Sequence, residues 1–335
     1  MRPTLTALTL LAATQAAALD CPEGQRAFSH PVLTGSEACV PDDPRRIAFL
    51  SEEGFNAYLL GVPSVTRNWD FDQLLALFPN RPEPDWPAGT VDAGWSGEAD
   101  PEVVATARPD LIVANTDTPE LNERLALIAP VVSREFEGAA GDWRMSDDFV
   151  ARLVGAEARL AEALGAIDAR IADFRARLPE AAPTFVVVRA PEPPDSTVEV
   201  DTEFRPGVRI AQEAGLALHG GVLSSADGAS LGSGGAAWYP LSLERVGDVD
   251  ADFVVVLPNG DSTSTRRLLE DPLFASLAAV REGRVVVAGG QRGEHWGYAG
   301  AAFAHLVMDE LYAGVLGLDP APTPNPHAGW MTVVE

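Results

Sequence analysis

The sequence predicts an α/β protein in which one long α-helix joins two lobes. Residues 147–178 carry an apolar stripe with steps of three, four or seven, the spacing of one helical face. The stripe consists of Leu153, Leu160, Leu164, Ile167, Ile171, Phe174 and Leu178. Strand-like and helix-like segments alternate on both sides of it, which is typical of parallel sheets covered by helices. At 1.5 Å per residue the helix would be about 45 Å long, enough to join two small lobes.

The sequence predicts strands and helices on both sides of the long helix and, with them, six segments of the chain. Before the long helix, strands are predicted at 46–50, 62–66, 111–114 and 131–132, and helices at 53–60, 73–78, 101–107 and 121–128. After it, strands are predicted at 184–188, 198–200, 253–257 and 284–287, and helices at 208–214, 243–246, 266–270 and 299–316. The segments are a signal peptide (1–18), a disulfide-closed segment (19–45), an N-terminal α/β lobe (46–146), the linking helix (147–178), a C-terminal α/β lobe (179–318) and a poorly ordered Pro-rich tail (319–335).

The composition narrows the range of partners. The 335 residues are 46% hydrophobic, enough for two modest cores, and carry a formal charge of -25. Such an acidic chain is unsuited to nucleic acid or to an anionic membrane surface. Every basic residue is Arg, because the sequence contains no Lys, so any anion site must be built from Arg.

The N-terminus is typical of a secretory signal peptide that is cleaved near Ala18. Arg2 provides the positive start, 5–13 a short apolar core, and 16–18 the small residues of a cleavage site. Asp20 is a poor residue before a lipidated Cys21, which favours a soluble exported protein over a lipoprotein. Cys21 and Cys39 are the only cysteines, and in an oxidising compartment they are expected to form a disulfide.

An internal repeat links the two halves. Asp100-Pro101-Glu102 precedes the strand that begins at Asp110, and Ser242-Leu243-Glu244 precedes the strand that begins at Asp252. Each Glu lies in the first turn of a capped helix, eight residues before its Asp. The equal spacing favours two similarly built lobes that each present one Glu.

Three segments resemble the class III periplasmic binding proteins of ABC importers: 102–113 (EVVATARPDLIV), 128–132 (IAPVV) and 271–287 (DPLFASLAAVREGRVVV). The cysteine loop and the following 39–50 (CVPDDPRRIAFL) look most like the iron–siderophore type of that family in Gram-negative bacteria. The resemblance extends over about 45–316. It implies two Rossmann-like lobes joined by a single helix, a ligand cleft between them, no enzymatic activity and no cofactor.

The resemblance also implies the partners. The ligand would be a ferric siderophore, an anionic iron chelate, and the protein would deliver it to an inner-membrane permease driven by ATPase subunits. Family members carry one Glu on each lobe that docks on Arg residues of the permease, and these positions correspond to Glu102 and Glu244. The protein is expected to be a periplasmic monomer that binds no nucleic acid.

Candidate ligand-binding residues lie in loops at strand ends, because open parallel sheets bind ligands outside the C-terminal ends of their strands. Arg can hold the anionic arms of a chelate bidentately, and Trp and Tyr provide flat apolar walls. The candidates are Arg67, Trp69, Trp95, Ser96, Arg189, Arg205, Trp238, Tyr239, Arg292, Trp296 and Tyr298. Arg67 with Trp69, and Arg292 with Trp296 and Tyr298, combine an Arg with nearby aromatic residues.

Several alternatives remain at this stage. Haem would need an axial ligand such as Tyr239, His295 or Tyr298, and cobalamin would favour a neutral aromatic cleft. The five histidines are too scattered in the sequence to suggest a metal site. A secreted α/β hydrolase would use Ser230, within a G-x-S-x-G motif, and His295, but no strand-like segment precedes Ser230 as a nucleophile elbow requires.

Overall fold

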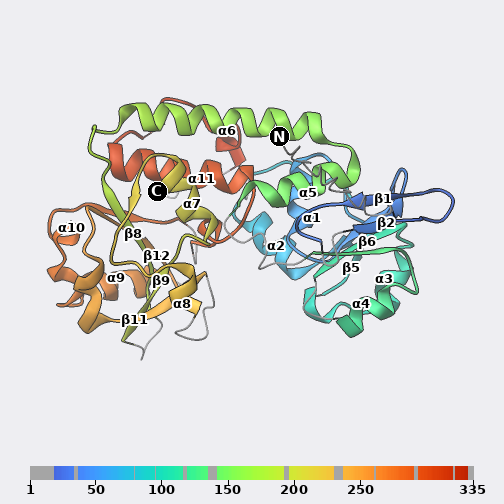
Figure 1. Ribbon diagram of the computed structural model, residues 1–335, viewed down its shortest axis with the longest axis horizontal. Coiled ribbons are helices and arrows are strands. Elements are labelled where there is room, and N and C mark those ends of the chain that lie inside the picture. The colour runs from blue at the N-terminus through green and yellow to red at the C-terminus, as the bar shows by residue number, and fades with distance from the viewer. Residues whose placement is uncertain are drawn as a thin grey trace, which may run out of the picture.

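Two lobes lie side by side beneath the helix α6 (Glu157–Arg177) in the computed structural model (Figure 1). The structure describes residues 19–33, 37–78, 80–94, 96–115, 119–134, 142–191, 196–229, 237–259, 262–289, 293–319 and 321–330. The predicted signal peptide lies outside this part of the chain. Among the helices within it, none has the length and apolar character needed to cross a membrane.

The N-lobe is built on parallel strands with β6 at the centre. The sheet has the order β3 (Ile47–Phe49), β6 (Leu111–Asn115), β7 (Val131–Arg134), and a bridge from Ile47 to Ser64 brings the parallel pair β4 (Thr66–Arg67) and β5 (Val91–Asp92) beside β3. The helices are α1 (Glu53–Leu59), α2 (Trp69–Ala76), α3 (Pro101–Thr106) and α4 (Pro119–Leu125). All these strands end at one edge of the lobe, so the residues that follow them are neighbours in space.

The C-lobe has a larger, mixed sheet in the order β11-β9-β8-β12-β13, with β10 beside β8. Its strands are β8 (Thr184–Arg189), β9 (Thr197–Asp201), β10 (Ala217–Leu218), β11 (Trp238–Ser242), β12 (Phe253–Leu257) and β13 (Val285–Val287). β9 is antiparallel to both its neighbours, whereas the sequence predicted mostly parallel pairing. The helices are α7 (Pro206–Glu213), α8 (Ser225–Ala229), α9 (Ser262–Glu270), α10 (Ala278–Arg281) and α11 (Ala301–Leu316).

The segment predicted as one linking helix, 147–178, is divided between two helices. α5 (Arg144–Val154) ends at Gly155, whose φ of 71° is left-handed, and α6 then begins in a new direction. Glycine adopts this conformation without a steric penalty and is the usual terminator of a helix. Of these two helices, α6 carries the chain from the N-lobe to the C-lobe. It is about 31 Å long, rather than the 45 Å expected for the single helix. Leu160 near its start packs in the N-lobe core, and Phe174 near its end packs in the C-lobe core.

A hydrophobic cluster joins the lobes directly. Phe55 and Phe78 of the N-lobe pack on Phe303 at the start of α11, with ring centroids 5.3 and 6.3 Å apart. Beside it, Asp147 of α5 accepts a hydrogen bond of 2.7 Å from the backbone N–H of Ala301. We call these contacts the lobe junction. A packed core between the lobes restricts their relative motion more than a single connecting helix would.

Residues 321–330 of the Pro-rich tail are ordered, whereas the sequence predicted a poorly ordered tail over 319–335. The backbone N–H of Asn80 donates to Trp330 O at 2.8 Å, and the Trp330 ring lies 4.5 Å from that of His327. Asn325 donates to Asp309 of α11 at 2.7 Å. These contacts hold the tail against the lobe junction because its aromatic residues complete the apolar surface there.

The predicted disulfide between Cys21 and Cys39 is present, with a Cα–Cα distance of 5.5 Å. It closes the antiparallel hairpin of β1 (Gln25–Ser29) and β2 (Glu37–Pro41). Phe28 and Val40 of this hairpin are buried in the N-lobe core, so the segment before 46 is part of the packed lobe.

Candidate ligand-binding site

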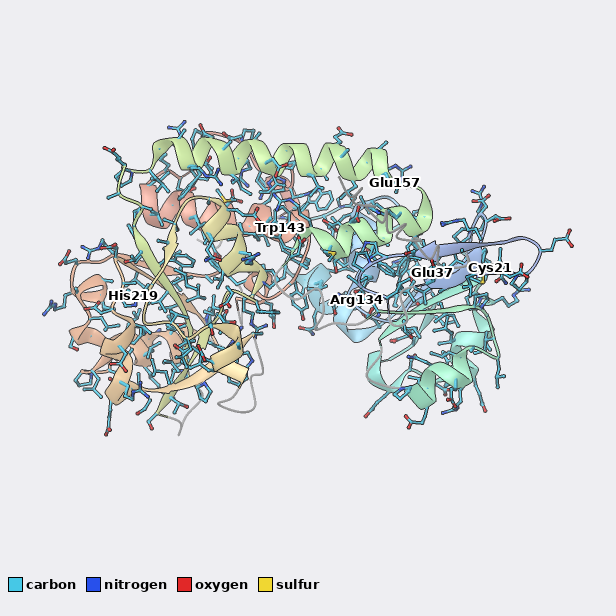
Figure 2. The ribbon with its side chains drawn as sticks, in the orientation of Figure 1. Cys21, Glu37, Arg134, Trp143, Glu157 and His219 are labelled. Atoms are coloured by element: carbon cyan, nitrogen blue, oxygen red, sulfur yellow. A yellow bond between two sulfur atoms is a disulfide. The ribbon has the colours of Figure 1, made fainter. Side chains whose placement is uncertain are left out.

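Arg134, the last residue of β7, lies in an ion-pair cluster at the C-terminal edge of the N-lobe sheet, on the margin that faces the other lobe (Figure 2). Its Nη2 donates to Glu52 Oε1 at 2.7 Å, and its Nε pairs with Glu53, which also accepts from Ser51 Oγ. The side chains of Arg134 and Glu53 are 5% and 0% exposed. This cluster was not predicted from the sequence, although Ser51-Glu52-Glu53 directly follows a predicted strand.

Arg67, the last residue of β4, is paired in the same manner. Its Nη2 lies 2.8 Å from both carboxylate oxygens of Asp72 in α2, and its guanidinium lies 5.4 Å from the centre of the half-buried Trp86 ring. The candidate therefore combines an Arg with an aromatic residue as predicted, but Trp86 rather than Trp69 is the described aromatic partner. A carboxylate of the protein already occupies the guanidinium fork that was expected to hold an anion.

The C-lobe has two further pairs at its sheet. Arg189, at the end of β8, lies 3.2 Å from Glu199 and donates to the Pro258 carbonyl at 3.4 Å. Arg205, which precedes α7, lies 3.4 Å from the fully buried Asp201. Burial raises the pKa of both Glu199 and Asp201, and the neighbouring guanidinium groups oppose that shift. All three described Arg candidates are therefore engaged by acids.

Tyr239 points into the C-lobe core rather than toward a ligand. Successive side chains of a strand face opposite sides of the sheet, so the half-buried Trp238 and Tyr239 lie on different faces. Tyr239 is only 2% exposed, and its hydroxyl accepts from the backbone N–H of Leu223 at 3.4 Å. Its prediction as a ligand residue, and as an axial haem ligand, is wrong for this reason.

Trp296 is also a core residue. It is completely buried, and its indole N–H donates to Glu310 Oε2 at 2.6 Å. His295 Nε2 lies 2.9 Å from Oε1 of the same Glu310, so both side chains fix the loop before α11. Tyr298 is half-buried and packs on Phe303, with 5.7 Å between ring centroids, which places it at the lobe junction.

The other candidates are described incompletely. Trp95, Arg292 and the hydrolase candidate Ser230 lie outside the described residues. Trp69 begins α2 and Ser96 begins the 3-10 turn Ser96–Glu98, but the description does not extend to their side chains.

A hollow of about 460 Å³ opens beside the C-terminal ends of β12 and β13. Pro258 and Val287 line its apolar wall, and Val287 is 47% exposed. Arg266 and Glu270 of α9 contribute one charge of each sign. Apolar walls with few polar groups are typical of small-molecule sites. The described residues include no cluster of three or more His, Cys, Asp or Glu that could hold a metal ion.

The two Glu residues of the internal repeat occupy equivalent positions. Glu102 N is capped by Asp100 at 2.8 Å and Glu244 N by Ser242 at 3.4 Å, and both Glu side chains are exposed. Asp110 and Asp252 each accept backbone N–H groups at the start of the neighbouring strand, from Arg46 and Thr184. Figure 1 shows α3 and β11, which adjoin the two Glu residues, at the ends of the lobes away from α6.

Comparison with known proteins identifies this architecture. Residues 47–291 match the model of the periplasmic binding protein family. The chain belongs to the periplasmic binding protein family. The match begins at β3 and extends beyond β13, so it includes α6 and the sheets of both lobes.

This periplasmic binding protein is 29% identical over 148 residues to the probable siderophore-binding lipoprotein YfiY of Bacillus subtilis, an alignment that spans 43% of each chain. Its fold is similar to a periplasmic solute binding protein from Mycobacterium smegmatis, with TM-score 0.69 and 19% identity over 88% of this chain and 99% of that one. The Fe³⁺–Desferal-bound FhuD from Vibrio cholerae gives TM-score 0.61 and 22% identity over 81% and 98%. At these identities the structural likeness concerns the fold.

Proposed function

We propose that this protein captures a ferric siderophore between its lobes and delivers it to the permease of an ABC importer. The observation that carries the proposal is a family match that runs through both lobes and the helix between them. The curated relative is named as siderophore-binding, and FhuD of the same fold was solved with a ferric siderophore. A haem or cobalamin ligand is the alternative within the same fold.

Tryptophan fluorescence tests the ligand class, because the chain has seven Trp and a bound ferric chelate quenches nearby indoles. We expect ferric siderophores to quench with a Kd of about 1 μM or below, on the order of 8 kcal/mol of binding free energy. Iron-free siderophores serve as the control. Binding of haem or cobalamin, without binding of any ferric siderophore, would replace the proposed ligand.

We further propose that Glu102 and Glu244 dock on Arg residues of the permease. Replacing both with Gln removes two exposed charges at the ends of the lobes away from α6. Because these side chains are exposed and are not among the proposed ligand-binding residues, ligand affinity should not change. Uptake driven by the reconstituted permease should fall at least about tenfold, or about 1.4 kcal/mol of lost docking free energy. Glu157→Gln, which removes an exposed charge at the start of α6, is the matched control. Uptake that is equal in all three proteins would contradict the docking role.

Membership in this family places the chain outside the cytoplasm. We propose a soluble periplasmic monomer, with the signal peptide cleaved near Ala18 and with lobes at 46–146 and 179–318. The sulfur of Cys21 is bonded to Cys39, which leaves no thiol for a lipid anchor of the kind implied by the name of the Bacillus subtilis relative. The permease and its ATPase subunits would then supply the energy for transport.

A further inference from the structure

Protein carboxylates already engage the guanidinium groups of Arg67, Arg134, Arg189 and Arg205, the described Arg residues at the strand ends and before α7. Arg67 holds Asp72 at 2.8 Å, Arg189 holds Glu199 at 3.2 Å, and Arg205 lies 3.4 Å from Asp201. Arg134 lies between Glu52 and Glu53. An anionic ligand would have to compete with each of these partners.

The buried pairs resist such competition. Arg134 and Glu53 have almost no exposed surface, and Asp201 is 1% exposed. Drawing Arg134 toward a ligand would leave Glu53 as an uncompensated buried charge, which is the costly way to break a buried ion pair. Arg134, and Arg205 beside the buried Asp201, therefore act as neutralised structural groups. The pairs of Arg67 with Asp72 and of Arg189 with Glu199 are less buried, and there an anion would compete with a partly exposed carboxylate.

The described ion-pair groups at the strand ends carry a net negative charge when all of them are ionised. The five carboxylates of Glu52, Glu53, Asp72, Glu199 and Asp201 exceed the four guanidinium groups. Burial raises the pKa of both Glu199 and Asp201, so this count refers to the fully ionised groups. The formal charge of -25 for the whole chain adds a long-range field that repels anions and attracts cations.

We propose, as a refinement that depends on the function proposed above, that the ligand is a ferric tris-hydroxamate that is neutral or carries a free ammonium group. Three singly charged hydroxamates neutralise one Fe³⁺, whereas three doubly charged catecholates leave a threefold negative complex. A neutral chelate requires no free Arg, and an ammonium group can approach the surplus carboxylates. The inference departs from the anionic chelate that the family resemblance implied, because the described Arg residues at the strand ends are already paired with carboxylates.

A charge series on one iron centre tests the proposal. Three ferric linear tris-hydroxamates would be titrated by Trp fluorescence: one with its terminal ammonium, one with that amine acetylated, and one with it succinylated. Their iron coordination is the same, and only the end group changes charge. At about 20 mM salt we expect the succinylated form to bind roughly tenfold more weakly than the ammonium form, and the difference to shrink at about 500 mM salt because salt screens exposed charges.

The possible outcomes separate this inference from the proposed function. Equal affinities within about twofold, or tightest binding of the succinylated form or of a ferric tris-catecholate, would overturn the charge preference and leave siderophore binding intact. Failure of every ferric chelate to bind would overturn both. Weaker binding of the succinylated form than of the ammonium form, with a difference that shrinks at high salt, would support both the siderophore function and the charge preference.

Two variants test whether the charge preference for the ligand arises at the strand ends. Glu52→Gln removes one carboxylate of the Arg134 cluster and keeps its hydrogen-bonding shape, so the succinylated form should gain affinity about threefold relative to the ammonium form. Glu157→Gln makes the same change in net charge at the start of α6, away from Arg134, and should leave the ratio unaltered (Figure 2). If both variants gave the same ratio as the parent, the Arg134 cluster would not be the source of the selectivity.

Discussion

Replacing Arg170 with Ala should lower the free energy of unfolding by about 3 kcal/mol. This side chain is fully buried on α6, where its Nη1 donates to the His305 carbonyl at 2.9 Å and its Nη2 pairs with Asp309. Asp309 also accepts from Asn325, so Arg170 holds α6, α11 and the C-terminal tail together. The large effect is expected because truncation removes the buried cation that pairs with Asp309 and the donor to the His305 carbonyl. Urea unfolding followed by far-UV circular dichroism measures it.

The matched control is Arg177→Ala on the same helix. Arg177 also pairs with an Asp, at 2.9 Å, but its side chain is 42% exposed and the partner Asp173 is 28% exposed. An exposed pair of this spacing contributes little to stability, because solvent screens it. Similar losses in the two variants would contradict the structural role assigned to the buried Arg170.

Asp147→Asn should remove a pH dependence of stability between about pH 4 and about pH 7. Burial raises the pKa of Asp147 to about 7, against the opposing effect of the hydrogen bond from Ala301. The unfolded state has an ordinary value of about 4, so the folded state binds the proton more tightly and the parent loses stability as pH rises through this window. The shift corresponds to about 4 kcal/mol. The difference in unfolding free energy, Asn variant minus parent, should increase by about this amount from pH 4 to pH 8.

Two buried histidines have the opposite effect on stability as the pH changes. Their contribution is the same in the parent and the variant, so it cancels in the difference of unfolding free energies. Burial lowers the pKa of His305 to about 3 and of His327 to about 4, so both reduce stability as pH falls below about 6.5, in parent and variant alike. Asp147→Ala separates charge from hydrogen bonding, since it should also lose the pH dependence but with a constant cost of about 1 kcal/mol for the missing cap of α11. A pH profile shared by Asp147→Asn and the parent would refute the prediction.

The architecture could be predicted from the sequence because it depends on periodic patterns. The alternation of apolar segments specified the two α/β lobes. Glu102 and Glu244 are both capped in a first helical turn, by Asp100 and Ser242, although the first helix is an α-helix and the second a 3-10 helix. The break at Gly155 was missed because Leu153 and Leu160 are seven residues apart and continue the helical stripe across it. Both residues pack in the N-lobe core, so the same pattern serves two helices.

The site was predicted less well, since the position of a loop residue does not specify the direction of its side chain. Trp296 follows a strand end as the rule requires, yet it packs against Gly207, where there is no room for a Cβ. The partners in ion pairs could not be predicted from the sequence either. Arg134 and Glu53 are 81 positions apart in the chain and come together because β3 and β7 belong to the same sheet. Asp147 is the first residue of the predicted linking helix, yet its side chain caps the helix α11 of the other lobe.

The lobe junction also determines how the chain can be divided. Either half, produced alone, would present the rings of Phe55 and Phe78, or of Phe303, to water, and an exposed aromatic patch of that kind promotes aggregation. An experiment that exchanges a lobe with a relative, or that reassembles the protein from fragments, would therefore have to keep both sides of the lobe junction from the same protein. These sides include residues 321–330.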